Sequence, residues 1–135
     1  MKMPAGEYYI GDLCYTMEDE WDECCELFFS GRTDHGCNEG QFTLKDGRRF
    51  VNFNTAHGDG EYETTTIHKI GVDSGSIGCI LVSDIRGMER ANILKMGIIY
   101  NFESDFGTST DGENLRFGPV TVFTGDDDEE DDYFD

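Results

Sequence analysis

The sequence predicts a single α+β domain: a mainly antiparallel β-sheet, folded into a sandwich or open barrel, with one amphipathic helix near the N-terminus. Three observations carry this prediction. They are a long β-branched run at residues 67–85, alternation with period two around the Asp46-Gly47 pair, and an apolar stripe at helical spacing between residues 17 and 28. At 135 residues the chain can bury one core but not two independent ones.

Residues 67–85, I-H-K-I-G-V-D-S-G-S-I-G-C-I-L-V-S-D-I, form the longest apolar and β-branched run of the chain. Such a run is typical of a buried strand with which other strands pair. Asp73-Ser74-Gly75 interrupts it, so we expect two strands that turn at this triplet. An acid beside a glycine at this point indicates either a tight turn or a functional carboxylate, and the local pattern fits both.

The remaining strands follow from alternation and turn residues. Asp46-Gly47 between alternating apolar runs is a strong hairpin signal and predicts a hairpin over residues 40–55. A short helical turn, bracketed by Gly87 and Gly97, fits residues 88–95. Further strands are expected at residues 6–17 (broken near Gly11-Asp12), 61–66, 95–103 and 118–124, with residues 108–114 as the turn between the last two.

The predicted helix covers residues 17–29. Thr16 has the position of an N-cap and Asp19 that of its capping-box partner. Met17, Trp21, Cys24/Cys25 and Phe28 recur at helical spacing and should face the core. The opposite face should present Glu20, Glu23 and Glu26 to water, and the helix should end near Ser30-Gly31.

The net charge of −19, from 29 acids and 10 bases, is unevenly distributed. The first 26 residues hold 8 acids and one base, and the last ten hold 8 acids and no base. This distribution repels nucleic acid and anionic membranes and attracts basic protein surfaces. No stretch is long and apolar enough to predict a membrane span.

Residues 126–135 are predicted to form a disordered acidic tail that follows a globular domain at residues 1–125. Such a tail either keeps the protein in solution or contacts a partner, and the aromatic pair near its end suits a docking motif. The residues predicted to bind a basic partner are therefore Glu20, Glu23, Glu26, Asp126, Asp127, Asp128, Glu129, Glu130, Asp131, Asp132, Tyr133 and Phe134.

The five cysteines are Cys14, Cys24, Cys25, Cys37 and Cys79. Their odd number, the adjacent pair and the absence of a signal-like start predict free thiols in a reducing, cytoplasmic setting. Because five acids surround Cys24 and Cys25 on the predicted helix, thiolates are disfavoured there. We interpret these two cysteines as packing residues.

Glycine-flanked aspartates are the candidate chemical groups. Asp12, Asp59 and Asp73 each lie beside a glycine or a Ser-Gly pair near a predicted strand end, and His57 lies two residues before Asp59. If they converge, they could bind Ca²⁺ or Mg²⁺, or serve a metal-dependent hydrolase. Asp73-Ser74-Gly75 also matches the triplet of a homodimeric aspartic peptidase, in which two such aspartates share a proton. Turn formation is the alternative for each, because Asx side chains bond the local backbone.

Three stretches resemble a family of small bacterial and phage proteins. They are G-E-Y-Y-I-G-D-L-C-Y at residues 6–15, T-A-H-G-D-G-E-Y at residues 55–62 and G-V-D-S-G-S-I-G at residues 71–78. The family pattern is G-x-Y-x-I-G-D-P-C-Y, T-A-Y-G-D-G-x-Y and V-D-A/S-G-x-I-G, from which Leu13 and His57 depart. The resemblance covers about the first two thirds of the chain. It implies a shared fold and transfers no catalytic residue, because the family is known by its motifs and not by an activity.

The preferred functional hypothesis is a non-catalytic acidic protein that engages a basic protein surface, in the manner of a phage-type antagonist that occupies a nucleic-acid-binding groove. The alternative is a metal-dependent hydrolase or a Ca²⁺- or Mg²⁺-binding protein that uses the glycine-flanked aspartates. The aspartic peptidase is the third hypothesis, and it requires a dimer.

Overall fold

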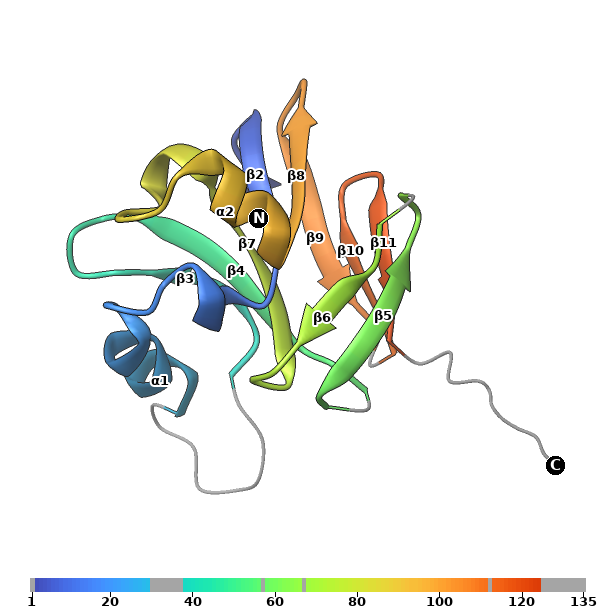
Figure 1. Cartoon of the computed structure of the whole chain (residues 1–135), viewed down its shortest axis with the longest axis horizontal. Coiled ribbons are helices and arrows are strands. Elements are labelled where there is room, and N and C mark those ends of the chain that lie inside the picture. Colours follow the sequence, from blue (N-terminus) through green and yellow to red (C-terminus); the bar gives the residue numbers. More distant parts are fainter. Residues whose placement is uncertain (1, 30–37, 57, 67, 112, 125–135) are drawn as a thin grey trace, which may run out of the picture.

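A computed structural model describes residues 2–29, 38–56, 58–66, 68–111 and 113–124 (Figure 1). The helices are α1 (Trp21–Phe29) and α2 (Arg90–Met96), with short 3-10 turns at η1 (Leu13–Tyr15) and η2 (Val82–Asp84). The strands are β1 (Lys2–Met3), β2 (Gly6–Gly11), β3 (Gly40–Thr43), β4 (Arg49–Asn54), β5 (Gly60–Thr64), β6 (Ile70–Val72), β7 (Ser76–Leu81), β8 (Gly97–Phe102), β9 (Phe106–Thr110), β10 (Asn114–Phe117) and β11 (Val120–Phe123).

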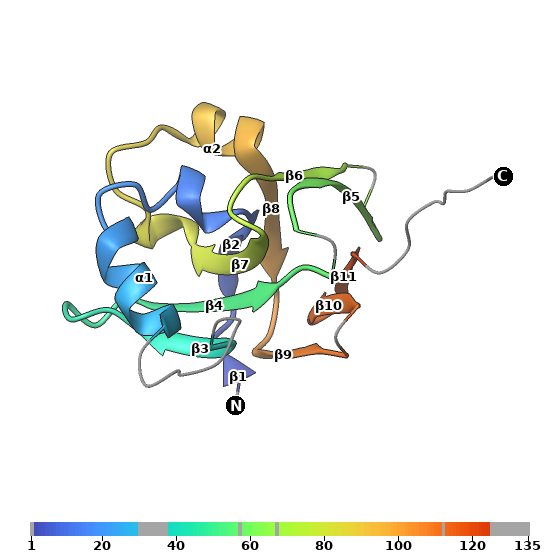
Figure 2. The same cartoon turned by 90° about the horizontal axis from the view of Figure 1, so that it is seen from below.

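The strands within the described ranges form two antiparallel sheets, one five-stranded with the order β3-β4-β7-β2-β8 and one six-stranded with the order β1-β9-β10-β11-β5-β6. Figure 2 shows the two sheets side by side, with α1 and α2 on the far side of the five-stranded sheet. The predicted α+β class, with a mainly antiparallel sheet and a helix near the N-terminus, is confirmed. The short helical turn expected at residues 88–95 corresponds to α2.

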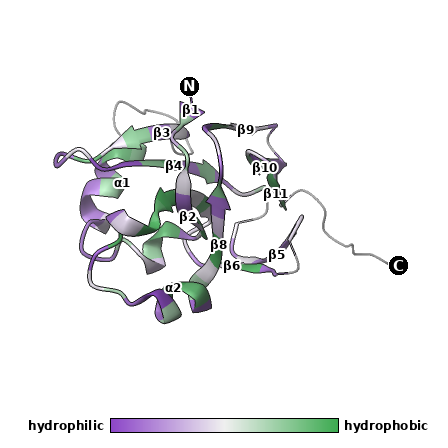
Figure 3. Cartoon of the chain, turned by 90° about the horizontal axis from the view of Figure 1, so that it is seen from above, coloured by the Kyte–Doolittle hydropathy of each residue, from purple (hydrophilic) through white to green (hydrophobic). Residues whose placement is uncertain are grey.

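Strand β7 lies in the middle of the five-stranded sheet, between β4 and β2. Both faces of this sheet are covered, so β7 is apolar at consecutive positions and does not alternate with polar residues. Ile77 and Cys79 belong to the core between the sheets, and Ile80 to the core beneath the helices. Figure 3 shows a concentration of hydrophobic residues around β2, the neighbour of β7 in this sheet. The prediction of a central buried strand in residues 67–85 is therefore correct.

The turn at Asp73-Ser74-Gly75 joins strands that belong to different sheets. Strand β6 before it pairs with β5 in the six-stranded sheet, and β7 after it pairs with β4 and β2 in the other. Gly75 has φ +83°, a left-handed conformation that favours glycine. The predicted turn is present, and it carries the chain from one sheet to the other.

The prediction for residues 108–114 is wrong, because most of this segment is strand. Residues 108–110 end β9, and β10 begins at Asn114. Between these strands Asp111 Oδ1 accepts hydrogen bonds from the backbone N–H groups of Glu113 and Asn114. The run T-S-T resembles a loop in sequence because all three of its polar side chains are at least partly exposed, on whichever face of the sheet they lie.

The predicted start of the helix is also wrong. Asp12 caps η1 by accepting a hydrogen bond from Cys14 N, so the first helical turn forms at residues 13–15. Thr16 follows this turn, and its hydroxyl donates to Leu13 O instead of capping a helix. Helix α1 begins only at Trp21. The apolar stripe is nevertheless correct, since Met17, Cys24 and Phe28 are buried.

Glycines form a row across the five-stranded sheet. The pairings Asn52↔Gly78, Gly11↔Gly78 and Gly11↔Gly97 place these residues at one level on neighbouring strands. The Tyr9 ring occupies the space beside Gly11 and Gly97, where a Cβ atom would lie within 3 Å of it. Because these positions lack side chains, the ring lies against the sheet, and the Tyr9 hydroxyl donates to Asp12 O at 2.8 Å.

Tyr9→Phe should lower the free energy of unfolding by about 1–2 kcal/mol, because it removes a buried hydrogen bond and keeps the ring that covers the glycines. Urea unfolding followed by circular dichroism measures this. As a matched control, Tyr100→Phe changes a half-buried tyrosine at the edge strand β8 and should cost less than 0.5 kcal/mol. Equal losses for the two variants would contradict the assigned role of the Tyr9 hydroxyl.

Candidate functional site

The three sequence motifs meet at one end of the two sheets, around the buried carboxylate of Asp12. Asp12 directly follows β2 and is 0% exposed. Its Oδ2 accepts hydrogen bonds from the backbone N–H groups of Asp73 and Ser74, both at 2.7 Å. Its Oδ1 accepts from Cys14 N at 3.0 Å and from Ser74 Oγ at 2.8 Å. One carboxylate thus joins η1 to the turn between β6 and β7.

The loop after β4 also takes part in this set of contacts. We call the whole set the Asp12 joint and define it as Asp12, Cys14, Thr55, Gly58, Tyr62 and the turn at residues 73–75. Thr55 N donates to Gly75 O at 3.0 Å, and its hydroxyl lies 2.8 Å from Gly58 O. The Tyr62 hydroxyl, which comes from β5, also donates to Gly58 O at 2.8 Å. Each motif therefore supplies hydrogen-bonding partners to another.

The surroundings of the Cys14 thiol in the Asp12 joint keep it protonated. Burial raises the pKa of Cys14 to about 12, and its hydrogen bond to Asp12 and the charges of Asp12, Asp73 and Asp59 act in the same direction. Burial and the same three carboxylates raise the pKa of Tyr15 as well. The three predicted aspartates thus lie around the same pair of side chains. Cys14 is held as a thiol, which is a poor nucleophile.

The aspartates differ in what they can still bind. Both oxygens of Asp12 already accept two hydrogen bonds each, whereas the side chains of Asp59 and Asp73 are exposed. His57 lies outside the described residues. Among the residues that are described, no group of three or more His, Cys, Asp or Glu side chains is placed to hold a metal ion.

Calorimetric titration with Ca²⁺ and Mg²⁺ tests the predicted cation site. If Asp59 and Asp73 bind a cation, the parent chain should release or absorb heat, and Asp59→Asn and Asp73→Asn should each remove most of it, because each variant loses one anionic oxygen ligand. If the parent chain gives no heat, the cation site is excluded. The result also covers ligands that lie outside the described residues, because the whole chain is titrated.

The triplet Asp73-Ser74-Gly75 has a structural role in the Asp12 joint. Its first two backbone N–H groups and the Ser74 hydroxyl all point to Asp12, and Ser74 Oγ also lies 3.0 Å from Ser76 Oγ. Within the described part of the chain, no hydrogen bond or ion pair involves the Asp73 carboxylate. The peptidase hypothesis still requires a second chain to bring a second Asp73 to this point.

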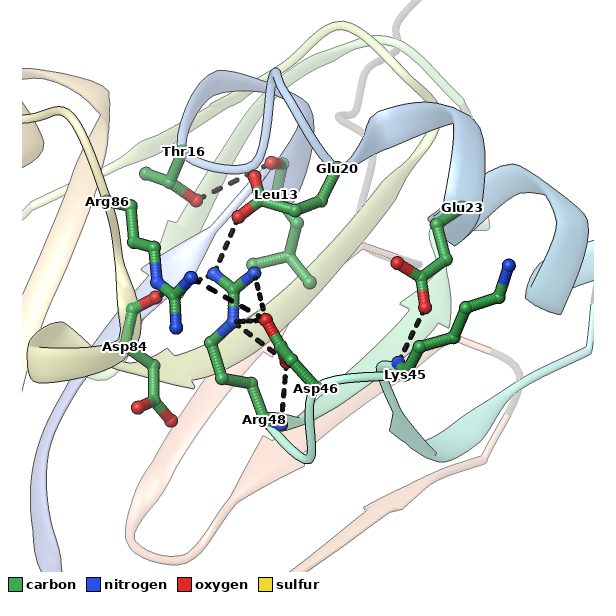
Figure 4. A network of polar contacts seen from close by, with 9 residues as sticks. All are labelled: Leu13, Thr16, Glu20, Glu23, Lys45, Asp46, Arg48, Asp84 and Arg86. Carbon is green, nitrogen blue, oxygen red and sulfur yellow. Dashed lines mark hydrogen bonds and ion pairs between the residues drawn. The ribbon is translucent and has the colours of Figure 1, made fainter.

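Two of the acidic residues before and on α1 attach this segment to the β3–β4 turn (Figure 4), and another is exposed. Glu20 contacts Arg48 at 2.6 Å, and only 15% of its side chain is exposed. Glu23 Oε2 accepts a hydrogen bond from Lys45 N at 2.7 Å. The prediction that Glu20 and Glu23 face water is therefore wrong, since both attach this segment to the β3–β4 turn. Glu26 is exposed, as predicted.

Arg48 is the residue of this region that sequence reasoning missed. Its guanidinium bonds Glu20, Asp46 and the Asp84 carbonyl, while its own side chain is only 10% exposed. The sequence feature that could have revealed Arg48 is its position, two residues after the Asp46 of the hairpin turn. Hydrogen bonds from the Arg48 side chain and backbone lower the pKa of Asp46 to about 2.

Arg48→Gln should lower the midpoint of thermal unfolding by roughly 5 °C near pH 6. The reason is that the carboxylates of Glu20 and Asp46 and the Asp84 carbonyl lose the guanidinium that they share. Since the folded pKa of Asp46 is depressed, its contribution is present above the unfolded pKa near 4 and is lost as the pH falls toward 2. The difference between the variant and the parent chain should therefore shrink over this range. Thermal melts at pH 6, 4 and 2.5 measure it. Arg116→Gln is the control, because its pair with Asp111 is exposed on both sides and should contribute little.

The predicted tail residues, Asp126 to Phe134, lie outside the described residues. Among those that are described, no helix has the length and apolar character that crossing a membrane requires. Comparisons with protein-family models, with curated proteins and with solved structures find no match. The resemblance to the bacterial and phage family therefore stays a prediction that rests on its three motifs.

Proposed function

We propose that this chain is a non-catalytic binding protein whose acidic surface engages a basic surface of a partner protein. The observation that carries the proposal is the exposed acidic face of the α1 region, which we define as Glu18, Asp19, Asp22 and Glu26. All four side chains are exposed. Among the described residues no ion pair involves any of them. Unpaired charges of one sign that are clustered on a surface favour association with the opposite charge.

Contacts on its other sides attach the segment that carries this face to the rest of the protein. Glu20 and Glu23 bond the β3–β4 turn on one side of the segment, while Cys24 and Phe28 are buried beneath it. Phe29, at the C-terminal end of α1, is 54% exposed and adds an apolar contact next to the acids. An exposed aromatic beside fixed charges is a common composition of a binding surface.

The Asp12 joint supports the non-catalytic part of the proposal. A general acid or base needs a carboxylate that can exchange a proton with a substrate, and a nucleophile needs an ionisable thiol or an activated hydroxyl. Asp12 is buried and accepts four hydrogen bonds, and Cys14 is held protonated. Both groups are better suited to holding loops together than to reacting.

The specific form of the proposal is a phage-type antagonist that occupies the basic groove of a nucleic-acid-binding protein in the cytoplasm. Acidic residues at both ends of the chain support this form, because such grooves are rich in Lys and Arg. The thiols of Cys14, Cys24 and Cys79 form no disulfide, which suits a reducing compartment.

Affinity capture with the full chain at 50, 150 and 500 mM NaCl tests the proposal. The test variant is Glu18→Gln/Asp22→Asn/Glu26→Gln. The matched control is Glu63→Gln/Glu89→Gln/Glu103→Gln, which removes the same charge from other exposed positions. We expect basic partners that the parent and the control capture at 50 mM, that the test variant binds about tenfold more weakly, and that salt releases. Partners that resist salt, or that both variants lose equally, would contradict the proposal.

A further inference from the structure

A hollow of about 780 Å³ opens between the edge of the six-stranded sheet and α2. Its walls come from β5, the end of the β5–β6 connection and β6 on one side, and from α2 and the start of β8 on the other; Tyr15 of η1 lines it as well. Figure 2 shows β6 beside β8 and α2, where the edge strands of the two sheets approach each other. The hollow has the size of a ligand site.

Two lysines line the hollow, although the chain as a whole is strongly acidic and Tyr15, which also lines the hollow, lies near the carboxylates of the Asp12 joint. Lys69 and Lys95 face it from opposite walls, together with His68, and Glu61 is the acid among its lining residues. Both lysines are exposed, and no ion pair among the described residues includes either one. Arginines elsewhere, such as Arg48 and Arg90, are paired with acids. The two lysines are therefore available to an anionic occupant.

The floor and rim of the hollow are partly apolar. Leu94 on α2 lines it and is 51% exposed, one of the two large hydrophobic side chains so exposed within the described residues. Met96 and Ile99 line it as well. An occupant that carries negative charge and a large apolar side chain would complement both the lysines and Leu94.

The C-terminal segment of the same chain has this composition. Residues 126–135, D-D-D-E-E-D-D-Y-F-D, carry eight acids, no base and an aromatic pair. The position at which this segment follows β11 also suits docking in the hollow. Phe123 pairs with Glu63 on β5, so Thr124 follows next to the level of Tyr62, which pairs with Ile70 on β6. Two strand spacings, about 10 Å, separate β11 from β6. The nine residues that follow Thr124, up to Tyr133, can span up to about 30 Å.

We propose that residues 126–135 dock in this hollow of their own chain, with the acidic run against Lys69 and Lys95 and the aromatic pair against Leu94. Tethering raises the effective concentration of the segment at the hollow, so a modest affinity suffices. A partner that binds the tail must first displace it from the hollow. This docking goes beyond the proposed function, and its test needs no partner protein. The docking proposal and the proposed function can therefore each fail without the other.

Zero-length cross-linking of the full chain tests the docking. A carbodiimide couples carboxylates to lysine amines in contact with them. The tail contains no lysine, and trypsin releases it in the peptide that follows Arg116. At low ionic strength we expect amide links from the tail to Lys69 and Lys95 at about fivefold the yield of links to Lys2 and Lys45, which are exposed lysines outside the hollow. At 500 mM NaCl this preference should fall.

Amide spectra of the ¹⁵N-labelled full chain provide a second measurement. Lys69→Gln/Lys95→Gln should shift the signals of residues 126–134, whereas Lys2→Gln/Lys45→Gln makes the same change of charge and should leave them in place. Equal cross-linking at all four lysines, or unchanged tail signals in the first variant, would overturn the proposal. So would links found only between chains in a mixture of ¹⁴N- and ¹⁵N-labelled protein, because the occupant would then be a second copy.

Discussion

Asp12→Ala is expected to lower the free energy of unfolding by about 4 kcal/mol, one of the two largest losses that we predict for a single side chain in this protein. The substitution leaves three backbone N–H groups, of Cys14, Asp73 and Ser74, and the Ser74 hydroxyl without their acceptor. A buried donor without a partner costs about 1–3 kcal/mol; these four donors are only partly buried, so water and the removal of a buried charge offset part of the sum. Urea unfolding at pH 7 measures the loss.

Two further substitutions make this result specific. Asp12→Asn keeps the shape but directs an amide N–H₂ toward N–H donors, so it should recover only part of the loss. Asp73→Ala removes an exposed carboxylate of the same joint and should change stability by less than 0.5 kcal/mol, because the contribution of residue 73 is its backbone N–H. If Asp12→Ala cost less than about 1 kcal/mol, the Asp12 joint would not hold the motifs together, and a chemical role for Asp12 would regain support.

Gly78→Ala should destabilise the protein by at least about 3 kcal/mol and leave little folded protein at 37 °C. Gly78 lies on the central strand β7, opposite Asn52 and Gly11. A Cβ atom there would overlap the Val51 carbonyl oxygen and lie 2.7 Å from Leu13 Cδ1. The Val51 carbonyl belongs to the neighbouring strand β4, so the clash can be relieved only by separating two paired strands.

Gly107→Ala is the matched control for Gly78→Ala. Gly107 also lies in a strand, β9, but a Cβ atom there meets no heavy atom within 4 Å. We expect its stability to stay within about 0.5 kcal/mol of the parent chain. Thermal unfolding and the yield of folded protein distinguish the two variants. A stable Gly78→Ala variant would show that β4 and β7 can move apart at Gly78 without loss of the fold, contrary to the overlap with the Val51 carbonyl that we expect.

Local patterns predicted most of the elements. The Asp46-Gly47 hairpin was predictable because Gly47 adopts φ +97°, a conformation that the dipeptide favours. The apolar stripe of α1 was predictable because the spacing of Trp21, Cys24 and Phe28 is a property of consecutive residues. The error at residues 108–110 has the same origin, since a strand with partly exposed polar side chains has no apolar alternation to distinguish it from a loop.

The candidate site was only partly predictable, because the same residue type serves opposite purposes in different surroundings. Glycine-flanked Asp12, Asp59 and Asp73 look alike in sequence, yet one is fully buried and the others are exposed. Likewise Glu20 and Glu26 occupy one acidic segment, but Glu20 is paired with an arginine that lies 28 residues further along the chain. The availability of a carboxylate depends on neighbours that only the folded chain provides.

The sequence by itself determined the elements whose causes are local: the strands with β-branched residues, the Asp-Gly hairpin, the apolar stripe of the helix and the concentration of acids at both ends of the chain. Only the tertiary structure decided which sheet each strand joins, that Asp12 holds a turn 61 residues away, and that Lys69 and Lys95 face one hollow. The physical reason is that strand pairing, burial and ion pairing depend on distances between residues far apart in the chain, which local propensity does not specify.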